Sequence, residues 1–387
     1  MSILRERPFE LLRKQSGEDF SATTIRNWYV ARTFVLQKLA TIAAEHAFAP
    51  NDSEHLHVVL KSDDERMLAV ARSVALYAHF LNFNEEGQAG SPEHRTVITI
   101  VSNRPDIKDV LQQEEYLCNL PRYCKYVDTA RAEYLRPDSY IDIELRIVPS
   151  HASHANDGVV VCIEKDEVDQ YFSQVADDDE SIFAIDTRKA FYADQMYDIG
   201  AAIDNLPAEN IHNAKRYTMA LNVYQFVQLK KQPKPMFAEH LPNQAKLKAR
   251  ISNIFCADCF ELRAAAMRHL GKNSTDRSTL WEMHNEVLSN SEHARWNVEK
   301  LILGYRPFSC EEHYAYQKIR AQRGCSPKLN HFRDSLKNNS QILAHIDLCS
   351  LNDLRRINPA DLKYDSFLML TIPKILAKLK EYENLPR

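Results

Sequence analysis

Short apolar runs alternate with helical segments between residues 55 and 190. The runs that favour strands are rich in Val and Ile and lie at 55–61 (HLHVVLK), 95–102 (RTVITIVS), 140–148, 158–164 and 181–186. Two segments between them, 63–80 and 104–120, carry apolar residues at helical spacing. This alternation predicts βαβ units, so we expect a Rossmann-like α/β domain with a mostly parallel sheet.

Helical spacing dominates the rest of the chain. Residues 20–48 predict one N-terminal helix, with Ser21 or Thr23 as its N-cap. Further helices are predicted at 191–230, 241–270, 278–304, 312–323 and 364–384. The pattern divides the chain into an N-terminal helical segment (1–50), the α/β domain (51–195) and two α-rich units (196–272 and 273–387).

The α/β domain does not carry a standard phosphate-binding loop. The chain has 8 glycines among 387 residues, and neither GxGxxG nor GxxxxGK[ST] occurs in it. The first predicted strand leads instead into KSDDER (61–66), whose carboxylates satisfy a helix N-terminus and repel a phosphate. We therefore expect a scaffold or an oligomerisation unit. The alternative is a metal-dependent nucleotide-processing enzyme that uses Asp63, Asp64 and Glu65.

Charge and hydropathy narrow the class of protein further. The formal net charge is −4, which disfavours nucleic-acid binding because that needs a basic surface. No run of about 20 apolar residues predicts a membrane span. The N-terminus is charged where a signal peptide is apolar, and eight cysteines are scattered along the chain. We therefore expect a cytoplasmic protein with reduced thiols.

The most informative segment is SNSEHARWNVEKLILGYRPF (289–308). It predicts a helix that Ser289 or Ser291 caps and that Gly304 ends as its C′ residue. One side of this helix carries Glu292 and, four, seven and eight residues after it, Trp296, Glu299 and Lys300. We expect the last two of these residues to form a solvated face.

Together with two later segments, this pattern resembles the RyR domain, the repeat found in ryanodine receptors and in many bacterial proteins. The later segments are HIDLCSLNDL (345–354) and LKYDSFLMLTIPKILAKL (362–379). The matched positions are Glu292, His293, Trp296, Gly304, Tyr305, His345, Leu348, Leu354, Asp365, Ile372, Pro373 and Leu376. The chain departs from the family at Tyr305, where Trp is more common, at Cys349 and Ser350, and in a longer 309–344 loop.

A weaker similarity precedes this segment over residues 208–271. Its matched positions are Ile211, His212, Phe237, Leu241, Pro242 and Gly271. It resembles the degenerate first repeat of bacterial tandem RyR proteins, which often carry a TrkA-type Rossmann-like domain ahead of the repeats. Lys215 stands where the second repeat has Trp296, so we expect this copy to be structural. The resemblance implies a degenerate repeat at 196–272 and an RyR domain at 273–387.

The resemblance also implies a soluble regulatory protein that binds a small nucleotide-related molecule, as in bacterial nucleotide signalling or defence, and not an enzyme. The predicted ligand-binding residues are Glu292, His293, Arg295, Trp296, Tyr305, Arg306 and Asp365. The aromatic rings would stack on a base, the arginines would hold a phosphate, and Glu292 would accept hydrogen bonds. No cofactor, metal or catalytic residue is expected. The expected partners are the ligand and further copies of the chain.

Each of these residues also has a structural interpretation. A helical Trp such as Trp296 is often part of a core, His293 can cap or bond internally, and Asp365 is a natural helix start. This interpretation leads to a second alternative, an assembly protein without a ligand. It predicts an apolar, filled space beside Trp296.

Three further motifs are expected to be structural. CADC (256–259) lacks the second ligand pair that a zinc site needs. HASH (151–154) has no carboxylate partner nearby in the sequence, and ADDDES (176–181) lacks the spacing and the glycine of a calcium loop.

Overall fold

The computed structural model describes two parts of the chain, which lie on either side of a long central segment. The described residues are 22–84, 94–135, 140–150, 157–175, 252, 255–256, 258–271, 280–322, 326–359, 361–362, 365, 369 and 372. Several predictions therefore lie outside them, namely the strand at 181–186, the helix at 191–230, the first part of the helix at 241–270, most of the helix at 364–384, and the HASH and ADDDES motifs.

A six-stranded, mostly parallel sheet organises the first part of the chain. Its strands are β1 (Leu56–Leu60), β2 (Thr96–Val101), β3 (Lys125–Asp128), β4 (Glu133–Leu135), β5 (Ile143–Val148) and β6 (Val159–Ile163). They lie in the order β4-β3-β5-β2-β1-β6, and only the β3–β4 pair is antiparallel. The predicted α/β class with a mostly parallel sheet is confirmed. The short strands β3 and β4 were not predicted.

One face of the sheet forms the main core. Alternate residues of β1, such as Leu56 and Val58, turn their side chains to this face and are at most 2% exposed. They pack with Ile98 of β2 and Leu145 of β5 against α3 (Glu65–Tyr77). The two-residue period of a strand explains why every second residue of these strands is apolar.

The predicted helix at 104–120 is wrong in its length. Only α4 (Ile107–Leu111) is helical, and turns then lead to α5 (Leu120–Tyr123). Cys118 adopts a positive φ of 47° between the two helices, which no continuing helix allows.

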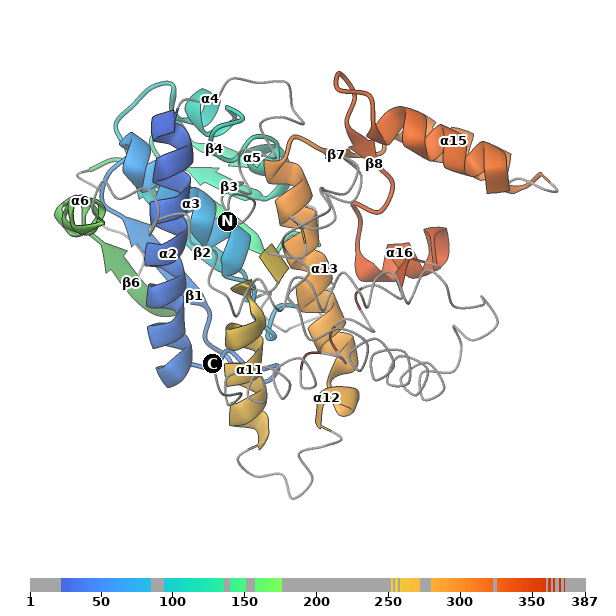
Figure 1. Ribbon diagram of the computed structural model, residues 1–387. Helices are drawn as coiled ribbons and strands as arrows, with labels where there is room; N and C mark the ends of the chain where they lie inside the picture. The colour runs from blue at the N-terminus through green and yellow to red at the C-terminus, as the bar shows by residue number, and fades with distance from the viewer. Residues whose placement is uncertain are drawn as a thin grey trace, which may run out of the picture.

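The N-terminal helix α2 (Ala22–Glu45) confirms the helix predicted at 20–48 and packs against α3 (Figure 1). Its Trp28 is 2% exposed and donates from Nε1 to the Glu115 carbonyl at 2.8 Å. Arg72 of α3 lies 4.2 Å from the centre of the Trp28 rings and donates to the Tyr116 carbonyl at 2.7 Å. The helix therefore shares one core with the sheet.

The long helix α13 (Asn285–Ile302) joins the second part of the chain to this core. It follows α12 (Leu280–Met283) and packs against α3 and α5. Asn119 fixes its end, donating from its backbone to the Leu301 carbonyl at 3.1 Å and from its side chain to the Gly304 carbonyl at 2.7 Å. Figure 1 shows α13 between the sheet and the C-terminal helices.

The sequence predicts the residues at both ends of α13, and the structure confirms only the C-terminal one. Gly304 has a φ of 84° directly after the C-cap, which confirms it as the C′ residue. The predicted caps Ser289 and Ser291 are wrong, because the helix starts at Asn285 and both serines lie inside it. Ser289 instead donates to the Asn285 carbonyl at 2.6 Å, one turn back.

Among the described residues, the chain after α13 contains two short strands and three helices. These are β7 (Arg306–Pro307), α14 (Cys310–Arg320), α15 (Ser326–Lys337), β8 (Ala344–His345) and α16 (Leu351–Ile357). The predicted helix at 312–323 is confirmed as α14, whereas α15 occupies part of the predicted 309–344 loop. β7 and β8 pair in parallel, which brings residues 305 and 345 close together. No helix in the part of the chain that the structure describes is long and apolar enough to cross a membrane.

Asp64 is the N-cap of α3, as the acidic segment predicts. Its carboxylate accepts from the backbone N–H groups of Arg66 and Met67 at 3.1 Å each, and from Lys165 Nζ at 2.7 Å. Replacing it by alanine removes the cap, so Asp64→Ala should lower the free energy of unfolding by about 1 kcal/mol in urea titrations. Asp64→Asn is the control and should retain most of the stability, because Asn caps equally well. Equal losses in both variants would assign the effect to the Lys165 ion pair instead.

Candidate functional site

Four rings meet where α13 passes the β7–β8 pair. The ring of His345 lies 4.9 Å from Trp296, edge to face, and 6.0 Å from Tyr305. His293 stacks on Trp296, with ring centres 5.9 Å apart and an angle of 15° between the planes. Trp296 is half-buried, while the other three side chains are buried. The predicted residues His293, Trp296 and Tyr305 are thus brought together.

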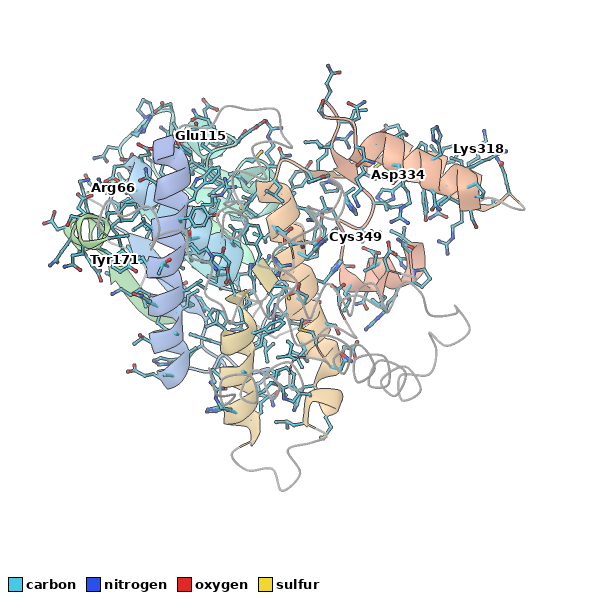
Figure 2. The ribbon with its side chains drawn as sticks, viewed as in Figure 1. Arg66, Glu115, Tyr171, Lys318, Asp334 and Cys349 are labelled. Carbon is cyan, nitrogen blue, oxygen red and sulfur yellow. The ribbon has the colours of Figure 1, made fainter. Side chains whose placement is uncertain are left out.

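His293 is held as a charged imidazolium. Its Nδ1 lies 3.0 Å from Asp365 Oδ2, and its Nε2 lies 3.0 Å from the Cys349 carbonyl. Both partners are acceptors, so both ring nitrogens carry a proton. Burial opposes this charge, but the Asp365 carboxylate raises the pKa of His293 well above its ordinary value. Asp365 therefore orients His293. Cys349, which provides the second acceptor, lies between α13 and α16 (Figure 2).

His345 is neutral, in contrast to His293. Its Nδ1 accepts from the Asp347 backbone N–H at 3.3 Å, so the proton of the neutral ring lies on Nε2. Burial lowers the pKa of His345 well below its ordinary value, and the charges of Lys337 and Lys300 lower it further. The Nε2–H group has no hydrogen-bond partner in the part of the chain that the structure describes. It is a donor that remains available.

Three cations surround His345. Lys300 of α13 lies 5.4 Å from the Trp296 ring centre and 2.6 Å from Glu299 Oε1. Arg333 of α15 contacts Asp361 at 2.8 Å and Asp347 at 3.3 Å. Lys337, also on α15, forms no ion pair or hydrogen bond with any described residue. Burial and the Lys300 charge lower the pKa of Lys337, and the Asp347 and Asp361 carboxylates offset this only in part. We call Trp296, Lys300, Tyr305, Lys337 and His345 the His345 site.

A chain of buried charges runs along α13 and ends at this site. We call it the buried ion chain, and its members are Arg263, Glu292, Arg295, Glu299 and Lys300. The first four are at most 3% exposed, and successive members are 2.6–2.9 Å apart. Arg263 comes from α11 (Phe260–Leu270), so the chain connects two helices.

The buried ion chain changes the roles of three residues. Glu292 and Arg295 were predicted to contact a ligand, but the structure uses their charged groups to pair with each other and with Arg263 and Glu299. Burial raises the pKa of Glu292 and of Glu299, but the neighbouring cations stabilise the charged carboxylates, so the pKa of each is lowered. The prediction of a solvated face at Glu299 is wrong, since its side chain is 0% exposed.

Arg306 is also occupied by a local partner. Its guanidinium contacts both carboxylate oxygens of Glu312 at 2.8 Å. The same carboxylate accepts from the Ser309 backbone N–H, and the Ser309 hydroxyl accepts from the Glu312 backbone N–H, which completes a capping box for α14. In the structure, therefore, Glu312 is the partner of Arg306.

The sequence analysis did not propose three groups of the site. Lys300 lies four residues after Trp296 on the same helix face, so the spacing could have identified it. His345 was a matched position without an assigned role. Lys337 comes from α15, a helix that was not predicted, so no local signal connected it with Trp296.

The carboxylates after β1 do not converge on a common point. Asp63 accepts from the Ser102 hydroxyl, Asp64 caps α3, and Glu65 accepts from Asn27 Nδ2 at 3.0 Å. Within the described residues, no group of three or more His, Cys, Asp or Glu side chains is placed to hold a metal. Each of the three acids thus has a structural partner within the described part of the chain.

The CADC cysteines lie in the core. Cys256 and Cys259 are at most 1% exposed, and the Cys259 thiol lies 3.6 Å from the Tyr77 carbonyl. Burial raises the pKa of Cys259 to about 11. Buried thiols of this kind are unreactive, consistent with the structural role that the sequence predicts.

Removing the centre of the buried ion chain should destabilise the protein strongly. Arg295→Met leaves Glu292 and Glu299 each with one cation fewer in the interior, so the free energy of unfolding should fall by about 3–5 kcal/mol. Urea unfolding followed by tryptophan fluorescence measures the loss. Arg355→Met, which breaks an exposed pair with Glu286, is the control and should cost less than about 1 kcal/mol. Similar values for the two variants would contradict the role of the chain.

Asp347 should make stability depend on pH. Burial and the nearby Asp361 carboxylate raise the pKa of Asp347 to about 6. An acid with a raised pKa in the folded state favours folding while it is protonated, and this contribution is lost as the pH rises from about 4 to above 6. Asp347→Asn abolishes the titration. The free energy of unfolding of the variant, relative to that of the wild type, should therefore be larger at about pH 7.5 than at about pH 4.5 in urea titrations. A difference that does not change with pH would contradict the assignment.

Comparison with family models, with curated proteins and with solved structures found no match to this chain.

Proposed function

We propose that the chain binds a small anionic, nucleotide-related molecule at the His345 site and acts as a regulatory protein. Lys300, Lys337 and the Nε2–H group of His345 would bind a phosphate, and Trp296 with Tyr305 would contact the base. The proposal keeps Trp296 and Tyr305 from the predicted site and replaces its arginines by two lysines. It also fits the RyR-like arrangement expected for 273–387.

The observation that carries the proposal is Lys337. A partly buried ammonium group costs free energy unless a partner compensates its charge. No described residue forms an ion pair with it. The Asp347 and Asp361 carboxylates raise its pKa, but burial and the Lys300 charge outweigh them, so the pKa of Lys337 is lowered. Lys300 and Lys337 repel each other in the free protein, and an anion bound between them would remove this repulsion.

The neutral state of His345 adds chemical selectivity. A neutral ring with its proton on Nε2 donates one hydrogen bond, which a phosphate oxygen accepts. A fourth positive charge at this position would bind an anion more strongly but with less geometric preference. The half-buried indole of Trp296 supplies aromatic surface, and stacking of a base on such a ring contributes about 1–3 kcal/mol.

The test uses two measurements on the same variant. Lys337→Met should leave the free protein at least as stable as the wild type, because burial and the Lys300 charge outweigh the stabilising effect of the Asp347 and Asp361 carboxylates on the lysine charge. It should also weaken binding of AMP, ATP, NAD or ADP-ribose by about tenfold or more, measured by isothermal titration calorimetry. If Lys337 only stabilised the fold, the variant would instead be less stable than the wild type, and its affinity for nucleotides would not change.

Matched variants separate the two halves of the site. Lys318→Met on the exposed side of α14 is the control and should leave binding unchanged. Trp296→Phe should reduce nucleotide binding but not the binding of inorganic pyrophosphate. If neither nucleotides nor pyrophosphate stabilise the wild-type protein in thermal unfolding, the proposal is wrong, and the assembly alternative gains support.

A further inference from the structure

Two carboxylates next to the His345 site share the same two hydrogen-bond donors. Asn358 Nδ2 lies 3.0 Å from Asp347 Oδ1 and 2.6 Å from Asp361 Oδ2. Arg333 Nη2 lies 3.3 Å from Asp347 Oδ2 and 2.8 Å from the same Asp361 oxygen. Because both acids contact one amide nitrogen and one guanidinium nitrogen, their carboxylates lie close together and repel each other when both are ionised. We call Asp347 and Asp361 the acid pair.

The acid pair is connected to the His345 site in two ways. The backbone N–H of Asp347 donates to His345 Nδ1 at 3.3 Å, and Asp347 Oδ2 lies 3.7 Å from the same nitrogen. Both carboxylates also stabilise the ammonium charge of Lys337, which lies one turn after Arg333 on α15. A change of charge on the acid pair therefore changes the electrostatic potential at the groups that would hold a phosphate.

The described charges around the acid pair balance without a ligand. Lys300 pairs with Glu299, and the ring of His345 is neutral. The two carboxylates of the acid pair then face the two cations of α15 that contact or stabilise them, so these four groups together carry no net charge. A phosphate would add negative charge to a largely buried region. Unbalanced charge is costly in the protein interior, so binding favours a compensating proton.

We propose that Asp347 takes up a proton when the His345 site binds its anionic ligand, so that acid strengthens binding. Such coupling, which rests on the function proposed above, regulates the same site by pH. The proton comes from the solvent and neutralises one member of the acid pair. Asp347 is the better acceptor of the two, because its side chain is 10% exposed and that of Asp361 is 27% exposed. Burial disfavours the charged form of an acid.

The free protein is already close to this protonation step. Burial and the Asp361 carboxylate raise the pKa of Asp347 to about 6. A bound anion repels the ionised carboxylate, so it raises this pKa further. By linkage, the affinity for the anion rises as the pH falls through the range between the pKa of the free protein and that of the complex. An increase of one unit in the pKa corresponds to a change of about tenfold in the dissociation constant.

The other titratable groups around Asp347 must be separated from it. Burial raises the pKa of Tyr316 on α14, so this side chain stays neutral. Burial opposes the charge of Arg333, but the acid pair outweighs burial and raises the pKa of this side chain, which stays charged. Burial lowers the pKa of His345 and that of Lys337. If either of these two titrated, anion binding would also depend on pH, so the experiment replaces Asp347 alone.

The first experiment measures proton uptake by isothermal titration calorimetry of the full-length protein with ADP-ribose. This probe has no phosphomonoester, a group that itself titrates near pH 6. At about pH 6.5, titrations in two buffers of different ionisation enthalpy should show uptake of about half a proton per bound ligand. The dissociation constant should be at least about fivefold lower at about pH 5.5 than at about pH 7.5. Binding without proton uptake overturns the coupling and leaves the proposed function standing.

Two variants identify the residue that takes up the proton. Asp347→Asn cannot titrate, so its uptake should fall to near zero, and its dissociation constants at the two pH values should differ by less than about twofold. Asp334→Asn makes the same change of charge at an exposed position of α15 (Figure 2) and should behave like the wild type. Uptake by the Asp347→Asn protein equal to that of the wild type overturns the assignment to Asp347. Absence of ADP-ribose binding at both pH values overturns it as well, and the proposed function is also wrong if AMP and pyrophosphate do not bind.

Discussion

The buried ion chain along α13 is the interaction on which the rest of the second part of the structure depends. Burying a charge is costly unless every member has a partner at close range. Arg295 meets this condition by contacting Glu292 and Glu299 one turn before and after it on the helix. Arg263 of α11 contacts Glu292 at 2.8 Å, so the ion pairs also connect α13 to α11.

The end of the buried ion chain positions the His345 site. Glu299 holds Lys300 at 2.6 Å, and this contact places the ammonium group over Trp296. Glu299 in turn accepts from Ser252 at 2.9 Å, so its place does not depend on Lys300. A phosphate that drew Lys300 away would leave Glu299 with Arg295 and Ser252. The site can therefore exchange its partner without leaving an isolated buried carboxylate.

The sequence predicts those parts of the fold that depend on local pattern. β1, β2, β5 and β6 follow from apolar runs, and Gly304 follows from the need for a positive φ after a helix. β3 and β4 were missed because they are short and part-exposed, so their pattern resembles that of a loop. The site was predicted in part, since Trp296 and Tyr305 lie close together along one segment.

The misjudged charges have a different origin. Acids and bases at spacings of three and four look like a solvated helix face, which is how Glu299 was interpreted. Their burial depends on Arg263, which lies on another helix, and on α3 and α5, which pack against α13. Sequence spacing reports which residues share a helix face but not what covers that face. Lys337 gave no signal in the sequence, because the groups that it interacts with, Lys300 and His345, lie on other elements. A buried cation without an ion pair is therefore visible only in three dimensions.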